Sequence, residues 1–294
     1  MLYYNIMKII IHSYSTIGSR NRNEDSMELI NNLDGININI NKILYAGIFD
    51  GHGGANISKS LVDNVYLSKY LCRTTSNMAN KLNDTVNYNN KYIVPLFTRI
   101  QEKLKNYNIS SNTMGSTVLI SLLYPNKKNF LNLKVINLGD SRTILCNNYN
   151  IGQPLTLDHK PHLYCEKNRI LQMGGDIHLT DDDDPRINGM SVSRAFGDLD
   201  NKYISQIPDI YDYKITHDKF IVMGCDGVWD VLGNQEVVDY VLEIYDNMII
   251  QKKKIVDMKG KSDNNIAQKL AEYAIEKDSK DNISVYIIFF IDNI

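Results

Sequence analysis

The chain has 294 residues, of which 43% are hydrophobic and 22% charged, enough for one large domain or two small ones. A formal net charge of −2 gives no overall attraction to nucleic acid or to anionic membranes. No apolar run approaches the ~20 residues that span a bilayer, and segment 1–11, interrupted by Asn5 and Lys8, does not resemble a secretory leader. We therefore expect a cytoplasmic or nuclear protein with no membrane or nucleic-acid partner.

Short segments rich in Ile and Val predict strands along most of the chain. In chain order they are residues 8–14, 43–49, 117–123, 131–137, 143–146, 220–225 and 283–291. The Asn-rich stretches 31–41 and 77–90 indicate loops, and the charge runs 181–184 and 252–254 indicate solvated loops.

Helical spacing of apolar residues lies between these strands. Two helices are predicted at 56–70 and 92–104. A third is predicted with Asn234 as its N-cap, and a fourth carries Ile266 and Leu270 on one stripe. Strands outnumber helices and short turns join several of them, so we predict an α+β fold rather than alternating βαβ units.

Four cysteines lie far apart and form no CxxC pair; they are Cys72, Cys146, Cys165 and Cys225. In a chain of this size we expect them to be free, buried thiols in a reducing compartment rather than disulfides. No His/Cys cluster has the ligand spacing of a zinc site.

Acidic residues recur where the predicted strands end. They are Glu24 and Asp25, Asp50, Asp140, Asp226, and Asp281. Any one of these positions could be an ordinary turn, because Asp-Gly is a common turn pair. Together at a sheet edge, however, the like charges would repel one another unless cations neutralised them. Ligation by oxygen alone favours Mg²⁺ or Mn²⁺ over zinc.

Nine short blocks also follow one another in a distinctive order. They are GSRNRNED at 18–25, DGHGG at 50–54, GST at 115–117, NLGDSR at 137–142, LTLDHKP at 155–161, EKNRILQMGG at 166–175, VSRAFGD at 192–198, CDGVWD at 225–230 and DNIS at 281–284. Their content and order resemble the type 2C metal-dependent serine/threonine protein phosphatases (PPM-type), over about residues 7–291.

The resemblance implies a four-layer αββα sandwich, with two central antiparallel β-sheets and a dinuclear metal cleft at one end. It implies a single domain over residues 1–294, with a variable flap at approximately 163–190. The implied activity is hydrolysis of phosphoserine and phosphothreonine by metal-activated hydroxide, with phosphoproteins as partners and a monomer as the expected state. A catalytically inactive binding module is the alternative; such relatives usually lose metal ligands, and here every expected acid is present.

The resemblance further implies the ligands of two Mg²⁺ or Mn²⁺ ions. Asp50 would bridge both ions, and Gly51 would offer its backbone carbonyl. Asp226 and Asp281 would bind one ion, and Glu24 the other. Roles near these ions follow in the same way: Asp25 would orient waters, and Asp140 and Asp230 would serve a weak third ion.

Two further residues resemble the family's catalytic groups. Arg20 would bind the phosphoryl oxygens, and His52 would protonate the leaving oxygen as the general acid. Arg22 lies close enough in sequence to compete for the role of Arg20, but the spacing of four residues before Glu24 favours Arg20. His52 could instead cap a turn, although its DGHGG context favours catalysis.

Overall fold

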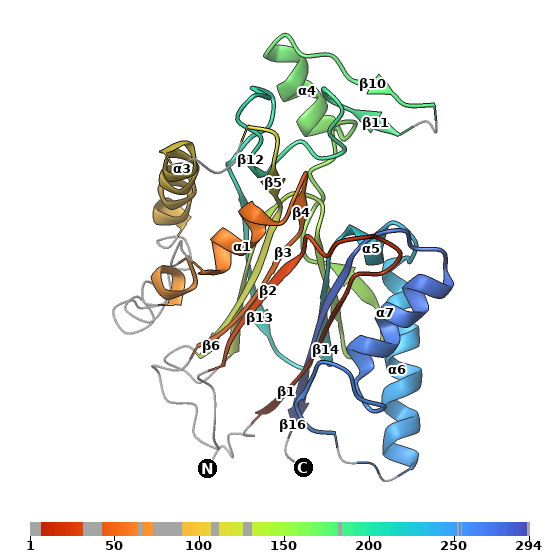
Figure 1. Cartoon of the computed structure of the whole chain (residues 1–294). Helices are drawn as coiled ribbons and strands as arrows, with labels where there is room; N and C mark the ends of the chain where they lie inside the picture. The colour runs from red at the N-terminus through yellow and green to blue at the C-terminus, as the bar shows by residue number, and fades with distance from the viewer. Residues whose placement is uncertain are drawn as a thin grey trace.

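The computed structural model describes residues 7–31, 43–63, 67–72, 90–106, 112–125, 131–181, 184–251, 253 and 255–292. Two large β-sheets form its centre, and Figure 1 shows helices α1 and α3 beside one sheet and α6 and α7 beside the other. The predicted α+β class is confirmed. None of the helices in these described ranges is long and apolar enough to cross a membrane.

The six-stranded sheet has the order β15-β1-β16-β14-β8-β9. Its strands are Met258–Lys259, Met7–Thr16, Ile283–Asp292, Phe220–Gly224, Arg142–Cys146 and Gly152–Pro154. Neighbouring strands are antiparallel except β1 and β15, which run parallel. The chain therefore places its first and last long strands side by side.

The five-stranded sheet has the order β13-β7-β6-β3-β2, and all of its pairs are antiparallel. Its strands are Asp209–Ile215, Leu131–Leu138, Val118–Pro125, Leu44–Phe49 and Ser26–Asn31.

Alternating side chains of the central strands enter different apolar clusters, because successive residues of a strand point to opposite faces. In β3, Leu44 and Ile48 join a cluster that also contains Ile221 of β14. Tyr45 and Phe49 of β3 pack instead with α1 and α3, and Val222 of β14 packs with α6 and α7. Both faces of these strands are covered, which explains why their sequences are apolar nearly throughout.

The helices contribute one apolar face each to the outer clusters. Their bounds are Asn56–Asp63 for α1, Asn90–Asn106 for α3, Asn234–Ile250 for α6 and Ile266–Glu276 for α7. A separate unit at one end of the molecule (Figure 1) contains α4 and the β10–β11 pair: Tyr164–Gln172, His178–Leu179 and Pro185–Arg186.

All seven predicted strands are present, whereas the sequence did not predict β2, β13 or α4. The residues of β2 are half-buried throughout, and β13 carries Asp209, Asp212 and Lys214 among its apolar residues. In such edge strands, apolar and polar residues do not alternate clearly along the sequence. The Asn-rich stretches and the charge runs fall largely or partly outside the described residues.

Two details of the predictions are wrong. The N-cap of α6 is Gly233 and not Asn234, whose side-chain oxygen instead accepts a hydrogen bond from Nη1 of Arg142 at 2.8 Å. All four cysteines are free as expected, but Cys165 is exposed and Cys72 is only half-buried.

Candidate active site

The acids predicted from strand ends approach one another at one end of the two sheets. Asp50 follows β3 and Asp140 follows β7 in the five-stranded sheet, while Asp226 follows β14 in the six-stranded sheet and begins α5 (Asp226–Trp229). Carboxylate oxygens of these three residues all lie within 4.8 Å of one another. Residues from three distant parts of the chain therefore form one acidic cluster.

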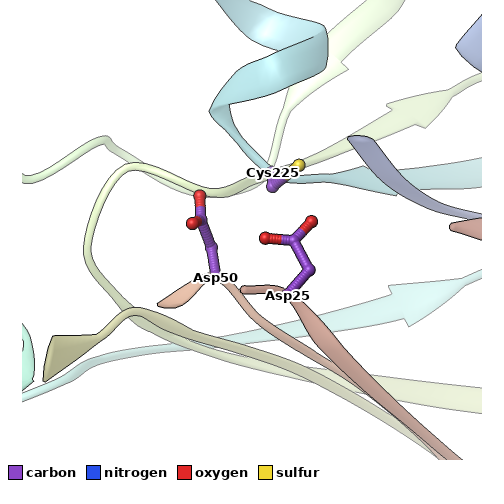
Figure 2. Close-up of side chains that lie close together, drawn as sticks. All are labelled: Asp25, Asp50 and Cys225. Carbon is purple, nitrogen blue, oxygen red and sulfur yellow. The ribbon is translucent and has the colours of Figure 1, made fainter. Parts of the chain in front are cut away.

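Asp25 extends this cluster on the side of β2. An oxygen of Asp25, an oxygen of Asp50 and the sulfur of Cys225 also lie within 4.8 Å of one another. Figure 2 shows both carboxylates pointing toward the segment that carries Cys225. Burial raises the pKa of the Cys225 thiol, which donates to the carbonyl of Asn282 at 3.4 Å, so this neighbour is a neutral group.

Burial and mutual repulsion disfavour the charged forms of these carboxyls. Burial is the main cause that raises the pKa of Asp50 and of Asp226 far above the usual range, and neighbouring aspartates add to it. Burial likewise raises the pKa of Asp25 to about 6 and that of Asp140 to about 7. The cluster therefore carries its full charge at neutral pH only if cations compensate it.

Two buried oxygens in the cluster lack protein partners. They are Oδ1 of Asp25 and Oδ1 of Asp140, neither of which has a hydrogen bond within the described part of the chain. Their residues are 8% and 2% exposed, so the unmet acceptors are costly unless something else binds them. Carboxylate oxygens without protein partners fit a hard divalent cation such as Mg²⁺ or Mn²⁺.

Glu24 lies on a loop that Asn282 holds. The Asn282 side chain accepts from the backbone N–H of Glu24 at 2.8 Å and donates to the carbonyls of Ile17 and Arg22 at 2.9 and 2.8 Å. The Glu24 carboxylate accepts from the N–H of Gly54 at 3.1 Å. Asn282 had no predicted role beyond its place in the DNIS block.

Gly51 sits where a side chain would not fit. A Cβ at this position would lie 2.4 Å from the carbonyl oxygen of Glu24 and 2.9 Å from Oγ of Ser58. The predicted ligand carbonyl of Gly51 therefore belongs to a backbone packed directly against the Glu24 segment.

Arg20 lies at the exposed rim of the cluster. Its Nη2 donates to Oδ2 of Asp281 at 2.6 Å and its Nε to the carbonyl of Lys280 at 2.9 Å, with the side chain 56% exposed. Arg22, the competing residue, is exposed as well. The structure thus places the guanidinium of Arg20 against one of the predicted metal ligands.

His52 pairs with an acid that the sequence did not single out. Nε2 of His52 lies 2.7 Å from Oδ2 of Asp198, which is 3% exposed. The two residues meet across a small sheet formed by β4 (Gly51–His52), β5 (Gly115–Ser116) and β12 (Phe196–Gly197). A Cβ at position 115 would lie 2.2 Å from Asp198 and 2.3 Å from His52, so glycine is required there.

Lys160 is a second unpredicted residue of the site. Its Nζ donates to Oδ1 of Asp230 at 2.8 Å and lies 3.9 Å from Oδ2 of Asp140. Asp230 is the most exposed of the acids here, with its side chain 54% exposed. Both Lys160 and Asp198 lie within the recognised blocks, but nothing in the spacing of the sequence indicates these contacts.

The raised pKa values predict how the stability of the metal-free protein depends on pH. Unfolded aspartates release their protons near 3.8, whereas folded Asp25 and Asp140 keep theirs up to about 6 and about 7. The folded state binds more protons in this interval, so stability should fall as pH rises from about 4 to about 7. Thermal melts in EDTA at about pH 5 and about pH 8 measure this, with Asp140→Asn expected to flatten the dependence. A melting temperature that is higher at pH 8 would contradict the burial of these charges.

Most of this chain is similar to proteins of one known family. The family model described as "Protein phosphatase 2C" matches residues 13–283. Protein phosphatase 1B of Mus musculus is 29% identical over 268 residues, and Protein phosphatase 1A of Homo sapiens is 29% identical over 265 residues. Each alignment covers 84% of this chain, and the chain spans only 62% of the length of these mammalian relatives.

One further relative matches only about half of this chain, and one solved structure matches nearly all of it. The PP2C-like domain-containing protein R307 of Acanthamoeba polyphaga mimivirus is 44% identical over 174 residues, which are 54% of this chain and 94% of that protein. The crystal structure of serine-threonine phosphatase 2C from Toxoplasma gondii superposes with a TM-score of 0.72, covering 99% of this chain and 96% of that one. At 22% identity, this structural likeness bears on the fold alone.

Proposed function

This chain belongs to the protein phosphatase 2C family, and we propose that it is a metal-dependent phosphatase acting on phosphoserine and phosphothreonine in proteins. The observation that carries the proposal is the acidic cluster, in which Asp50, Asp140 and Asp226 converge from both sheets. An inactive member of the family would have no need for such a concentration of buried charge.

We assign the divalent ions to the residues that the sequence singled out. Two ions would be held by Glu24, Asp50, the Gly51 carbonyl, Asp226 and Asp281, with Asp25 beside them and Asp140 and Asp230 available to a weaker third. The unpartnered oxygens of Asp25 and Asp140 support this assignment. Bound cations would lower the pKa of a water toward neutrality and offset the negative charge of the phosphoryl group.

Arg20 and His52 would act on the substrate directly. The planar guanidinium of Arg20 suits bidentate contact with phosphoryl oxygens, and its ion pair with Asp281 keeps it beside the acidic cluster. In His52, Nε2 is engaged by Asp198, so Nδ1 is the nitrogen that remains to give a proton to the leaving oxygen. Asp198 would thus orient the imidazole for that transfer.

The finer architecture belongs to the same proposal. We place the chain in a single domain over residues 1–294, built as a four-layer αββα sandwich with the metal cleft at one end. Three apolar clusters support it, because one contains residues of both sheets and the other two each join a sheet to its helices. The unit containing α4 lies within the predicted flap at approximately 163–190.

Release of inorganic phosphate from phosphothreonine and phosphoserine peptides tests the function. The purified chain with Mn²⁺ is expected to turn over both peptides. Binding of the peptides without phosphate release would instead support the inactive binding module and overturn the proposal.

A further inference from the structure

One histidine holds the turn that carries Asp140. The N–H of Gly139 donates to Nδ1 of His159 at 2.9 Å, and the N–H of His159 donates to the carbonyl of Gly139 at 3.0 Å. His159 is 2% exposed, and Gly139 has a φ of +117°, a conformation that side-chain-bearing residues rarely adopt. The backbone N–H and the carbonyl of Gly139, which precedes Asp140, are therefore both hydrogen-bonded to His159.

The other ring nitrogen of His159 connects to a partly exposed ion pair, in which the side chain of Asp209 is 37% exposed. Because Nδ1 accepts a hydrogen bond, the ring proton lies on Nε2, which donates to Oδ2 of Asp209 at 3.1 Å. Oδ1 of Asp209 accepts from Nη1 of Arg194 at 2.9 Å. Burial alone would raise the pKa of Asp209, but the hydrogen bonds from His159 and Arg194 lower it to about 2. Asp209 is thus a permanent carboxylate and a stable acceptor for the histidine.

Arg194 continues these contacts to helix α4. Its Nε and Nη2 donate to Oε1 of Glu166 at 3.0 and 2.6 Å. Oε2 of Glu166 accepts from Oγ of Ser193 at 2.7 Å and from Nη2 of Arg169 at 2.9 Å. Burial would raise the pKa of Glu166, yet hydrogen bonds from Arg194 and Ser193 lower it to about 2. Ion pairs and hydrogen bonds therefore connect a helix of the predicted flap to the segment that supports Asp140.

We propose that His159 is the positioning residue of Asp140, and that α4 influences the direction of this carboxylate through Glu166, Arg194, Asp209 and His159. The inference rests on the proposed function in one respect, because it takes Asp140 to be a ligand of the weakest ion. A shift of the Gly139 peptide would turn the Asp140 carboxylate relative to Asp50 and Asp226, with which it shares the cluster. Outer contacts of this kind affect metal affinity although they touch no metal.

Two substitutions of His159 separate its two hydrogen bonds. In His159→Asn, the amide oxygen occupies the position of Nδ1, so the bond from Gly139 can be kept while the bond to Asp209 is lost. In His159→Gln, the amide nitrogen occupies the position of Nε2, so the bond to Asp209 can be kept while the acceptor for Gly139 is lost. The pair therefore has similar polarity but opposite effects on the turn.

Two quantities are measured. One is the rate of hydrogen exchange at the Gly139 amide, and the other is the affinity of each Mn²⁺ site, determined by electron paramagnetic resonance. We expect His159→Gln to lose protection from hydrogen exchange at the Gly139 amide. The weakest Mn²⁺ site should lose affinity by about 10-fold, the lower end of the range for lost contacts to metal ligands. His159→Asn should retain protection at Gly139 and weaken the same Mn²⁺ site by a smaller factor, about 3-fold, because it still loses the contact with Asp209. Glu166→Gln, on α4, should weaken the same Mn²⁺ site.

Asp212→Asn is the matched control. It breaks a different ion pair of β13, in which Lys134 is 1% exposed, and should lower the melting temperature without changing Mn²⁺ affinity. Equal Mn²⁺ affinity and equal Gly139 protection in His159→Gln and His159→Asn would overturn the proposal. Neither readout requires turnover, so a chain that binds Mn²⁺ but cleaves no phosphopeptide contradicts the proposed function and leaves this inference standing.

Discussion

Substitution of Asp226 or Asp50 by asparagine is expected to lower kcat on a phosphothreonine peptide by at least ~10²-fold. Each change removes a charge that would balance a cation while nearly preserving the shape of the side chain. Both residues lie in the acidic cluster, where carboxylate oxygens from different strands come within 4.8 Å of one another. Weaker ion binding should therefore slow hydrolysis of the phosphopeptide without changing the structure of the surrounding sheets.

The measurement is kcat at saturating Mn²⁺, compared with the exposed control Asp239→Asn on α6. The control should retain wild-type turnover. In EDTA, both cluster variants should melt at or above the wild-type temperature, because removing one of several crowded carboxylates relieves repulsion. Near-normal turnover in both Asp226→Asn and Asp50→Asn would refute their assignment as metal ligands.

Substitution of His52 by glutamine is expected to slow phosphoserine peptides by roughly 10²–10⁴-fold. An alkoxide is a poor leaving group and needs a proton from the general acid. An aryl phosphate has a good leaving group, needs little protonation, and should lose much less. Rates on the two substrates, measured under the same metal conditions, give the ratio that identifies proton transfer.

Arg20→Ala provides the contrasting pattern. Arg20 would contact the phosphoryl group, which both substrates share, so both rates should fall by similar factors. Arg22→Ala, at the exposed neighbour, should affect neither rate strongly. If His52→Gln slowed both substrates equally, His52 would not be the general acid and would remain an element of the turn that contacts Asp198.

The sequence was sufficient to predict seven apolar strands and the position of the acids along them. Strands such as β3 are buried on both faces, which produces apolar runs bounded by Asp and Gly. Acids placed at the ends of such strands meet wherever the strands share a sheet edge. The approach of Asp50 to Asp140 agrees with that inference, whereas Asp226 joins them from the other sheet, which local pattern does not indicate.

The supporting contacts could not be predicted because they depend on the packing of distant segments. His52 meets Asp198 across 146 residues of sequence, and Glu24 is held by Asn282 across 258. No period or spacing encodes such pairs. The strand β13 was missed for a related reason, since its charged residue Asp209 pairs with Arg194 and His159, which lie in other segments of the chain.

Removal and restoration of metal would show whether hydrolysis by this chain depends on bound cations. Hydrolysis of a phosphothreonine peptide should vanish when the purified chain is treated with EDTA, and should return when Mn²⁺ or Mg²⁺ is added in excess. Activity should track ion occupancy, because the buried carboxylates of Asp50 and Asp226 carry charge at neutral pH only with a compensating cation. Full activity in a metal-free preparation would contradict the account.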